Sequence, residues 1–292
     1  MIGVQAMENK TTIQMTIRKG EQTETVRLPC DFLTIKVALY QMDVLKEPDG
    51  VAVQDVGATF QSDDVLGQKL TAMIQPTDLL SDVDIAAYVL RAAPKPVREA
   101  LSKMVLEDGL ENIRDIVTQR DALVEQLGQC QQSYYFPLTC TFEDEESDYT
   151  PVEGYPEDLL RNADKIQKAL QRDQSDLMDT MAIYFWTSNP ETTASIREKL
   201  VACVWDVEER EGRLYGKVEV TSTVPLDAIE GQAMKDWICG QNSDGLGEGF
   251  EQRPIETEWG DLYVHLWHSG NDYEIVTAEE MGVGQRFGME MG

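Results

Sequence analysis

The most distinctive string in the chain is a glycine-rich segment, residues 240–252. It contains Asp244, Gly245, Gly247, Glu248 and Gly249. Glycine-rich loops hold phosphate groups when they lead into the N-terminus of a helix. This segment instead follows a predicted helix, whose C-terminal end carries negative dipole charge. Because its acidic residues add more negative charge, the sequence argues against a phosphate site.

Oxygen atoms of Asn242, Asp244 and Glu248 in the same segment could coordinate Ca²⁺. An EF-hand loop, however, places glycine at its sixth position and glutamate at its twelfth, and this spacing differs. We therefore interpret residues 240–252 as a structural loop whose glycines adopt positive φ between a helix and a sheet. A functional role of the loop is kept as an alternative, and no metal or cofactor is predicted.

The histidines and cysteines give no catalytic pattern. His265 and His268 are the two histidines, and residues three apart in a strand point to opposite faces, so we do not expect them to share a metal. The five cysteines are Cys30, Cys130, Cys140, Cys203 and Cys239. Their odd number, wide spacing and lack of a C-x-x-C motif indicate reduced, structural thiols in a cytoplasmic protein. We predict no catalytic residue.

Negative charge is the dominant property of the chain. The 53 acidic side chains outnumber the 25 lysines and arginines, which gives a formal net charge of -28. Such a field repels nucleic acid and anionic membranes and attracts basic surfaces. The acidic residues that we expect to face a partner are Glu143, Asp144, Glu145, Glu146, Asp148, Glu157 and Asp158. They form either a solvated acidic segment or part of a surface that imitates DNA, which carries one charge per about 1.7 Å.

Charge and tryptophan content divide the chain near residue 130. Residues 1–127 hold 20 acidic and 13 basic side chains, whereas residues 128–292 hold 33 and 12, together with all 5 tryptophans. The length allows two domains, and we predict them at 1–127 and 128–292. No apolar run approaches the roughly 18 residues of a membrane span. The first residues lack the pattern of a secretory signal, which again favours a cytoplasmic location.

Hydrophobic periodicity predicts the elements of the first part. Residues 12–28 alternate like a hairpin, and Asp31 is placed to cap a helix that runs to Met42. Residues 51–60 alternate and predict a strand. Helical spacing then predicts three helices, at about 77–93, 97–109 and 110–127.

The second part is predicted as an α+β module with an antiparallel sheet. We expect a strand at 134–142, helices at 157–172 and 176–186, and a hairpin at 200–220 that turns at Glu211-Gly212. A helix with Pro225 in its first turn is expected to stop at Gly240. Short strands are expected at 250–257, 261–267 and 272–276, followed by a frayed tail at 283–292. The predicted fold class of the whole chain is α+β.

Several strings in the first part resemble a known family. They are Leu28-Pro29, the apolar helix through Ala38-Leu39, the segment Val53–Val56, residues 79–90 and residues 101–117. In this order they resemble the ArdA-type antirestriction proteins, whose helix reads -L-x-x-L-N-x-L-A-x-x-L- where this chain has residues 79–90. Asp84 stands where the family pattern has asparagine, and residues 13–127 are less acidic than the family.

The two resemblances imply a setting for the protein. Residues 237–252 resemble a domain in mobile-element proteins of gut Firmicutes, which implies a context and no mechanism. The ArdA resemblance implies an acidic protein that occupies the DNA-binding groove of a type I restriction-modification enzyme without a cofactor. The alternative is a non-enzymatic interaction module whose charge serves solubility, with an apolar patch near Trp259 and Trp267. A third alternative is an enzyme or metal-dependent protein that uses the glycine-rich loop.

Overall fold

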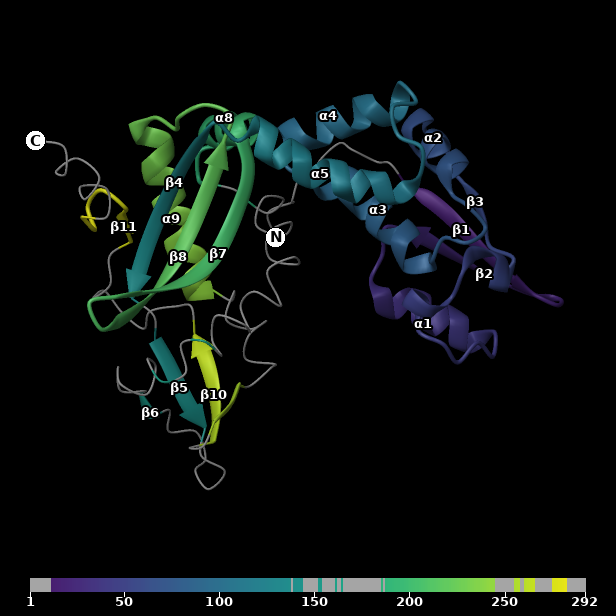
Figure 1. Cartoon of the computed structure of the whole chain (residues 1–292), viewed down its shortest axis with the longest axis horizontal. Coiled ribbons are helices and arrows are strands. Elements are labelled where there is room, and N and C mark those ends of the chain that lie inside the picture. The colour runs from purple at the N-terminus through teal and green to yellow at the C-terminus, as the bar shows by residue number, and fades with distance from the viewer. Residues whose placement is uncertain are drawn as a thin grey trace, which may run out of the picture. The chain divides into compact units, whose positions relative to one another are not determined.

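The chain forms two compact units, residues 1–127 and residues 128–292; the first contains one sheet and the second two, and both contain helices (Figure 1). The computed structural model describes residues 12–137, 139–143, 152–153, 161, 164, 185, 187–244, 255–257, 260–265 and 275–282. Every strand pairing between the described strands is antiparallel. The predicted α+β fold class is therefore confirmed.

The first unit combines a three-stranded sheet, in the order β2-β1-β3, with helices. Its elements are β1 (Ile13–Lys19), β2 (Gln22–Leu28), α1 (Phe32–Gln41), η1 (Pro48–Gly50), η2 (Val53–Val56), β3 (Thr59–Gln61), α2 (Val65–Met73), α3 (Leu80–Ala92), α4 (Lys95–Leu106) and α5 (Ile113–Leu127). Helix α3 packs against β2, α4 and α5, so it joins the sheet to the remaining helices.

The hairpin at the start of the first unit is confirmed. Ile13, Met15 and Ile17 alternate along β1 and are fully buried, which leaves the residues between them on the other face. The turn contains Gly20, whose φ of 63° is a left-handed conformation that glycine adopts without steric cost. The Asp31 cap is also confirmed, because its carboxylate accepts a hydrogen bond from the backbone N–H of Leu33 at 2.8 Å.

The strand predicted at residues 51–60 is wrong for most of its length. Val53–Val56 form the short 3₁₀ helix η2, and only Thr59–Gln61 form a strand. Val53 and Val56 are both buried. Because a 3₁₀ helix has three residues per turn, these two side chains lie on the same side of η2. Helix α2 was not predicted, whereas the three later helices of this unit are confirmed.

The second unit contains two four-stranded sheets, in the orders β11-β4-β8-β7 and β6-β5-β10-β9. Its elements are β4 (Cys130–Pro137), β5 (Thr139–Glu143), β6 (Val152–Glu153), α8 (Pro190–Lys199), β7 (Leu200–Arg210), β8 (Arg213–Ser222), α9 (Ala228–Asp244), β9 (Ile255–Thr257), β10 (Gly260–His265) and β11 (Val276–Thr277). The hairpin β7–β8 turns at Glu211-Gly212 as predicted, and both residues have positive φ.

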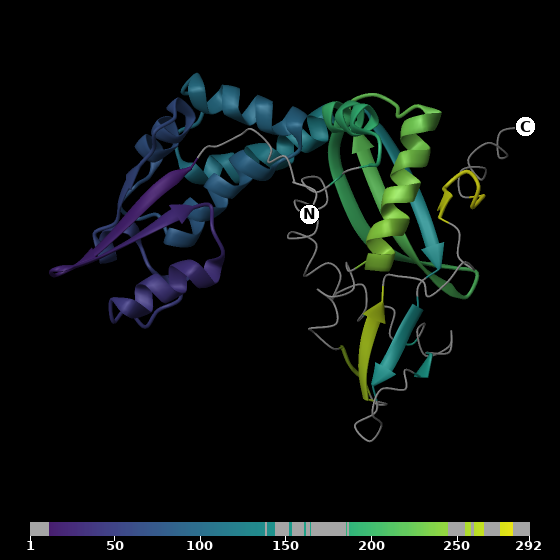
Figure 2. The same ribbon diagram turned by 180° about the vertical axis from the view of Figure 1, so that it is seen from behind.

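Helix α9 covers one face of the β4–β8–β7 sheet. The helix lies behind the sheet in Figure 1 and in front of it in Figure 2. The residues buried between them come from strand and helix alike, including Tyr134, Val218, Met234 and Ile238. Gly216 lies opposite Phe136 in the sheet, and a Cβ atom there would overlap the Phe136 ring. Glycine at this position lets the aromatic ring lie directly over the neighbouring strand.

Two predictions for the second unit need correction, and one helix was missed. The strand predicted at 134–142 is two strands, β4 and β5, which belong to different sheets. The helix expected from Pro225 to Gly240 begins at Ala228 and continues to Asp244. Helix α8 was not predicted. The predicted helices at 157–172 and 176–186 and the tail at 283–292 lie outside the described residues, apart from residues 161, 164 and 185.

Candidate functional site

Of the seven acidic residues that the sequence proposed for partner binding, the structure describes Glu143 alone. Glu143 is the last residue of β5, where it pairs in register with Asp261 of β10. The other six proposed residues, Asp144, Glu145, Glu146, Asp148, Glu157 and Asp158, lie outside the described residues.

The glycine-rich segment begins later than predicted. Asp244 is the last residue of helix α9 and is not part of a loop. Gly240 lies inside the helix, because α9 continues past it for four further residues. Gly245, Gly247, Glu248 and Gly249 lie outside the described residues.

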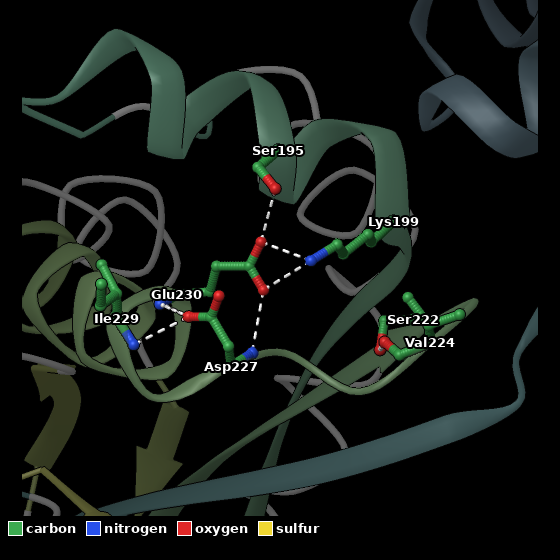
Figure 3. A network of polar contacts seen from close by, with 7 residues as sticks. All are labelled: Ser195, Lys199, Ser222, Val224, Asp227, Ile229 and Glu230. Atoms are coloured by element: carbon green, nitrogen blue, oxygen red, sulfur yellow. Dashed lines mark hydrogen bonds and ion pairs between the residues drawn. The ribbon is translucent and has the colours of Figure 1, made fainter.

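The described carboxylate with the most polar contacts is that of Glu230, near the start of α9 (Figure 3). Its side chain is buried, with 3% of the residue exposed. Lys199 Nζ lies 2.5 Å from Oε1 and 2.8 Å from Oε2. The Ser195 hydroxyl donates to Oε1 at 2.6 Å, and the backbone N–H of Asp227 donates to Oε2 at 2.9 Å. We call Glu230, Lys199, Ser195 and Asp227 the Glu230 cluster.

Part of this cluster is a helix cap. The Asp227 carboxylate accepts hydrogen bonds from the backbone N–H groups of Ile229 and Glu230, each at 2.9 Å. Glu230 accepts in return from the Asp227 N–H, so the two side chains form a reciprocal capping box. This cap explains why α9 starts at Ala228 and not at Pro225. The preceding loop is fixed by the Ser222 hydroxyl, which donates to the Val224 carbonyl at 2.7 Å.

The rest of the cluster joins α9 to α8. Ser195 and Lys199 are four residues apart on α8, so both face Glu230 from one side of that helix. Nearby, the Arg197 guanidinium donates two hydrogen bonds to the Phe185 carbonyl, at 2.6 and 3.0 Å. The Phe185 ring in turn meets Trp237 of α9 edge to face, with centroids 5.0 Å apart. Polar and aromatic contacts therefore fix the same pair of helices.

Electrostatics favour a structural role for the Glu230 cluster. Burial raises the pKa of Glu230, but hydrogen bonds from Lys199, Ser195 and Asp227 and the charge of Lys199 outweigh it and leave the pKa below its usual value. An ionised, fully paired carboxylate with a lowered pKa is a weak base. It has little capacity to remove the Ser195 proton, as activation of a serine nucleophile requires.

In the first unit, a hydrogen bond between Cys30 and Asp84 involves two groups that could take part in chemistry. The Cys30 backbone N–H donates to Asp84 Oδ1 at 3.0 Å. Burial, with a smaller contribution from the negative charge of Asp31, raises the pKa of Asp84 to about 6. Burial and the nearby carboxylates raise the pKa of the Cys30 thiol to about 12. Because the thiolate is the reactive form, this thiol is a poor nucleophile at neutral pH.

Charged side chains of the β4–β8–β7 sheet pair with one another. Glu208 forms an ion pair with Arg210 and accepts a hydrogen bond from the Tyr135 hydroxyl at 3.2 Å. Lys217 Nζ lies 2.8 Å from a Glu219 carboxylate oxygen. The negative charges of Glu208 and Glu219 in this hairpin are therefore partly neutralised by their neighbours.

The described residues offer little for a metal or a small ligand. Among them, no group of three or more histidine, cysteine or acidic side chains is arranged to hold a metal ion. A hollow of about 380 Å³ in the first unit is lined by uncharged residues, including Val53, Phe60, Thr71 and Ile74. None of the described helices combines the length and the apolar character that crossing a bilayer requires.

Sequence reasoning missed the Glu230 cluster. One signal was available, since Asp227 followed three residues later by Glu230 has the spacing of a capping box. No pattern in the sequence indicates that Ser195 and Lys199, more than thirty positions earlier, approach the same carboxylate.

No family model matches this chain, and no curated protein and no solved structure is significantly similar to it. The ArdA resemblance therefore rests on the strings between Leu28 and Val117 that were quoted for it.

Proposed function

We propose that this protein acts by binding a basic, DNA-handling protein and occupying the groove in which that protein binds DNA. The partner that we propose first is a type I restriction-modification enzyme, in line with the ArdA resemblance of residues 13–127. The proposed setting is the cytoplasm of a host that carries a mobile element. Binding would need neither catalysis nor a cofactor, because carboxylates would take the places of phosphates.

The observation that carries this proposal is the excess of 53 acidic over 25 basic side chains in a chain that also builds packed cores. A folded polyanion attracts basic clefts and accelerates association with them. The excess is greatest in residues 128–292, with 33 acidic and 12 basic side chains. We therefore expect that unit to supply most of the electrostatic attraction.

The proposal is tested by competition for DNA. A purified type I restriction-modification enzyme is incubated with labelled target DNA and increasing amounts of this protein. We expect the protein to displace the DNA, and we expect displacement to weaken strongly between about 0.1 and 1 M salt, where the Debye length falls from about 10 to about 3 Å. A panel of such enzymes that all keep their DNA at low salt would contradict the proposal.

A second candidate function is an interaction module whose charge serves only solubility. The observation that favours it is the mixing of charges on the described surface of the first unit. There lysines and arginines pair with acidic neighbours, as in Lys36–Glu47, Lys69–Asp108 and Arg114–Asp82. A mixed surface of this kind suits solubility. Partner binding that persists at high salt would favour this candidate over DNA mimicry.

A further inference from the structure

Helix α1 is apolar on two opposite sides. Ile35, Ala38 and Leu39 are buried against the rest of the first unit. Phe32, Leu33, Val37 and Tyr40 lie on the other side and are exposed, Leu33 to 59%. Positions 32, 33, 36, 37 and 40 fall within one face of a helix with 3.6 residues per turn. We call the four exposed apolar residues the α1 stripe.

An exposed apolar stripe of this kind indicates a surface that binds another molecule. Scattered exposed apolar residues are ordinary, but a contiguous group on one helix face marks an interaction surface. Helix α1 lies at the periphery of the first unit, away from α4 and α5, in both views (Figures 1 and 2).

The two ends of the stripe differ in charge. At the N-terminal end, the carboxylates of Asp31 and Asp84 flank Cys30 closely enough for each acid to disfavour ionisation of the thiol. Along the helix, Lys36 is already paired with Glu47, at 2.7 Å, and lies 5.6 Å from the centre of the Tyr40 ring. At the C-terminal end, Lys19 Nζ donates to the Asp43 carbonyl at 2.9 Å. Two carboxylates therefore lie close together where the stripe begins, whereas a lysine accompanies Asp43 where the stripe ends.

We infer that the α1 stripe binds an amphipathic segment of the partner whose apolar side covers Phe32, Leu33, Val37 and Tyr40. A lysine or arginine of that segment lies beside Asp31 and Asp84. Such a segment supplies an apolar cover for the stripe and a cation for the two carboxylates at the N-terminal end of α1. A second copy of the chain fits poorly, because its like-signed carboxylates would meet in a chain of net charge -28. The inference rests on the proposed function in one respect, namely that the partner is basic.

The test uses the full chain and three labelled synthetic peptides of about 16 residues, which is about four helical turns. One is an amphipathic leucine–lysine helix, the second has the same composition without an apolar side, and the third is an amphipathic leucine–glutamate helix. We expect the first to bind at least about tenfold more tightly than the others, as measured by fluorescence anisotropy. Hydrogen exchange of the wild-type chain should show protection of residues 32–41 on binding.

Two double variants locate the contact. Leu33→Ser with Val37→Ser should lower the affinity for the leucine–lysine helix about tenfold, whereas Ile229→Ser, at a residue 72% exposed in the other unit, should leave it unchanged. Asp31→Asn with Asp84→Asn should weaken binding and keep the α1 cap, since asparagine caps as well as aspartate. Asp43→Asn, at the other end of the helix, is the matched control and should have little effect.

Several results would overturn the inference. One is equal binding of the two leucine–lysine peptides, which would mean that charge alone attracts them. Another is wild-type affinity in the Leu33→Ser/Val37→Ser variant together with no protection of residues 32–41. A third is self-association of the wild type that this variant abolishes, because the occupant would then be a second copy. Each result leaves the DNA competition experiment unaffected, so failure of the inference is distinguishable from failure of the proposed function.

Discussion

The surroundings of Asp84 favour the neutral form of its carboxyl group over the ionised form. It is half-buried on α3, accepts a hydrogen bond from the Cys30 N–H and lies near the negative charge of Asp31. Burial is the main reason that its pKa rises to about 6. An asparagine oxygen at this position could accept the same hydrogen bond without the cost of a buried charge.

We predict that Asp84→Asn stabilises the first unit at neutral pH. The folded state holds the Asp84 proton up to about pH 6, whereas an unfolded aspartate releases it near about pH 4. The native state therefore binds more protons in this window, so wild-type stability falls as pH rises through it. The variant should gain about 1–2 kcal/mol above pH 6 and almost nothing near pH 4, after allowance for the partial exposure of the group.

Urea unfolding followed by circular dichroism at several pH values measures this difference. Asp63→Asn, at an exposed position of the same unit, is the control and should not change the pH dependence. A gain in the Asp84→Asn variant that is equal at all pH values would contradict the electrostatic explanation, because it would not depend on ionisation.

At the scale of elements, the Glu230 cluster determines how α8 and α9 pack. Lys199 and Ser195 come from one helix, and the cap formed by Asp227 and Glu230 begins the other. Removing one member of a buried ion pair costs more than removing an exposed pair, because the remaining charge loses its partner and stays buried. The contribution of the cluster to stability can be measured against the pair Lys235–Glu280 of the same unit, whose carboxylate is half exposed while that of Glu230 is buried.

We predict that Lys199→Met destabilises the second unit by about 2–4 kcal/mol, while Lys235→Met costs less than about 1 kcal/mol. Both substitutions keep an apolar stem and remove a lysine charge, so they form a matched pair. Urea unfolding monitored by tryptophan fluorescence reports this unit, since all 5 tryptophans lie in residues 128–292. Equal costs for the two variants would mean that burial of the Glu230 carboxylate does not strengthen its pair relative to Lys235–Glu280.

The pH dependence gives a second readout for the same variant. Because the pKa of Glu230 is lowered in the folded state, its contribution is present above the ordinary glutamate pKa and is lost as pH falls through the folded value. Without Lys199, the largest hydrogen-bonding contribution that lowers this pKa is gone. The acid-induced loss of stability should therefore begin at a higher pH in Lys199→Met than in the wild type.

Elements with strong periodicity were predictable, and those defined by tertiary contacts were not. The hairpin at residues 13–28 and helix α3 follow from apolar spacing, and buried residues such as Ile13 and Leu80 confirm it. Helix α8 is mostly polar, and its start depends on Asn189, whose side chain accepts from the N–H groups of Glu191 and Thr192. Residues 51–60 alternate in the manner of a strand, yet buried Val53 and Val56 are three apart and favour a 3₁₀ turn.

The candidate site was less predictable than the fold. The Asp227–Glu230 spacing is a local signal, so the cap could have been found from the sequence. The approach of Lys199 and the burial of Glu230 depend on packing between α8 and α9, which no local pattern encodes. The α1 stripe was also missed, because apolar residues at helical spacing indicate a helix but not which of two apolar sides is buried.

At the scale of the whole molecule, the two units differ in their excess of acidic residues, and this difference affects their stability. Residues 128–292 carry 33 acidic and 12 basic side chains, and residues 1–127 carry 20 and 13. Excess charge of one sign destabilises a compact state through self-repulsion. The second unit should therefore bear most of the cost of the net charge of -28, although ion pairs such as Lys217–Glu219 relieve part of it.

We predict that salt stabilises the second unit more than the first. Raising NaCl from about 0.1 to about 1 M shortens the Debye length from about 10 to about 3 Å, which screens repulsion between exposed carboxylates. Tryptophan fluorescence follows residues 128–292 alone, and hydrogen exchange of α3 and α5 follows the first unit. We expect the urea midpoint of the second unit to rise with salt and hydrogen exchange in the first unit to change less.

Two outcomes would contradict this prediction. An equal rise in the stability of both units would mean that salt acts by favouring burial of apolar surface in general. A fall in the stability of the second unit would mean that its ion pairs contribute more than the repulsion between its carboxylates.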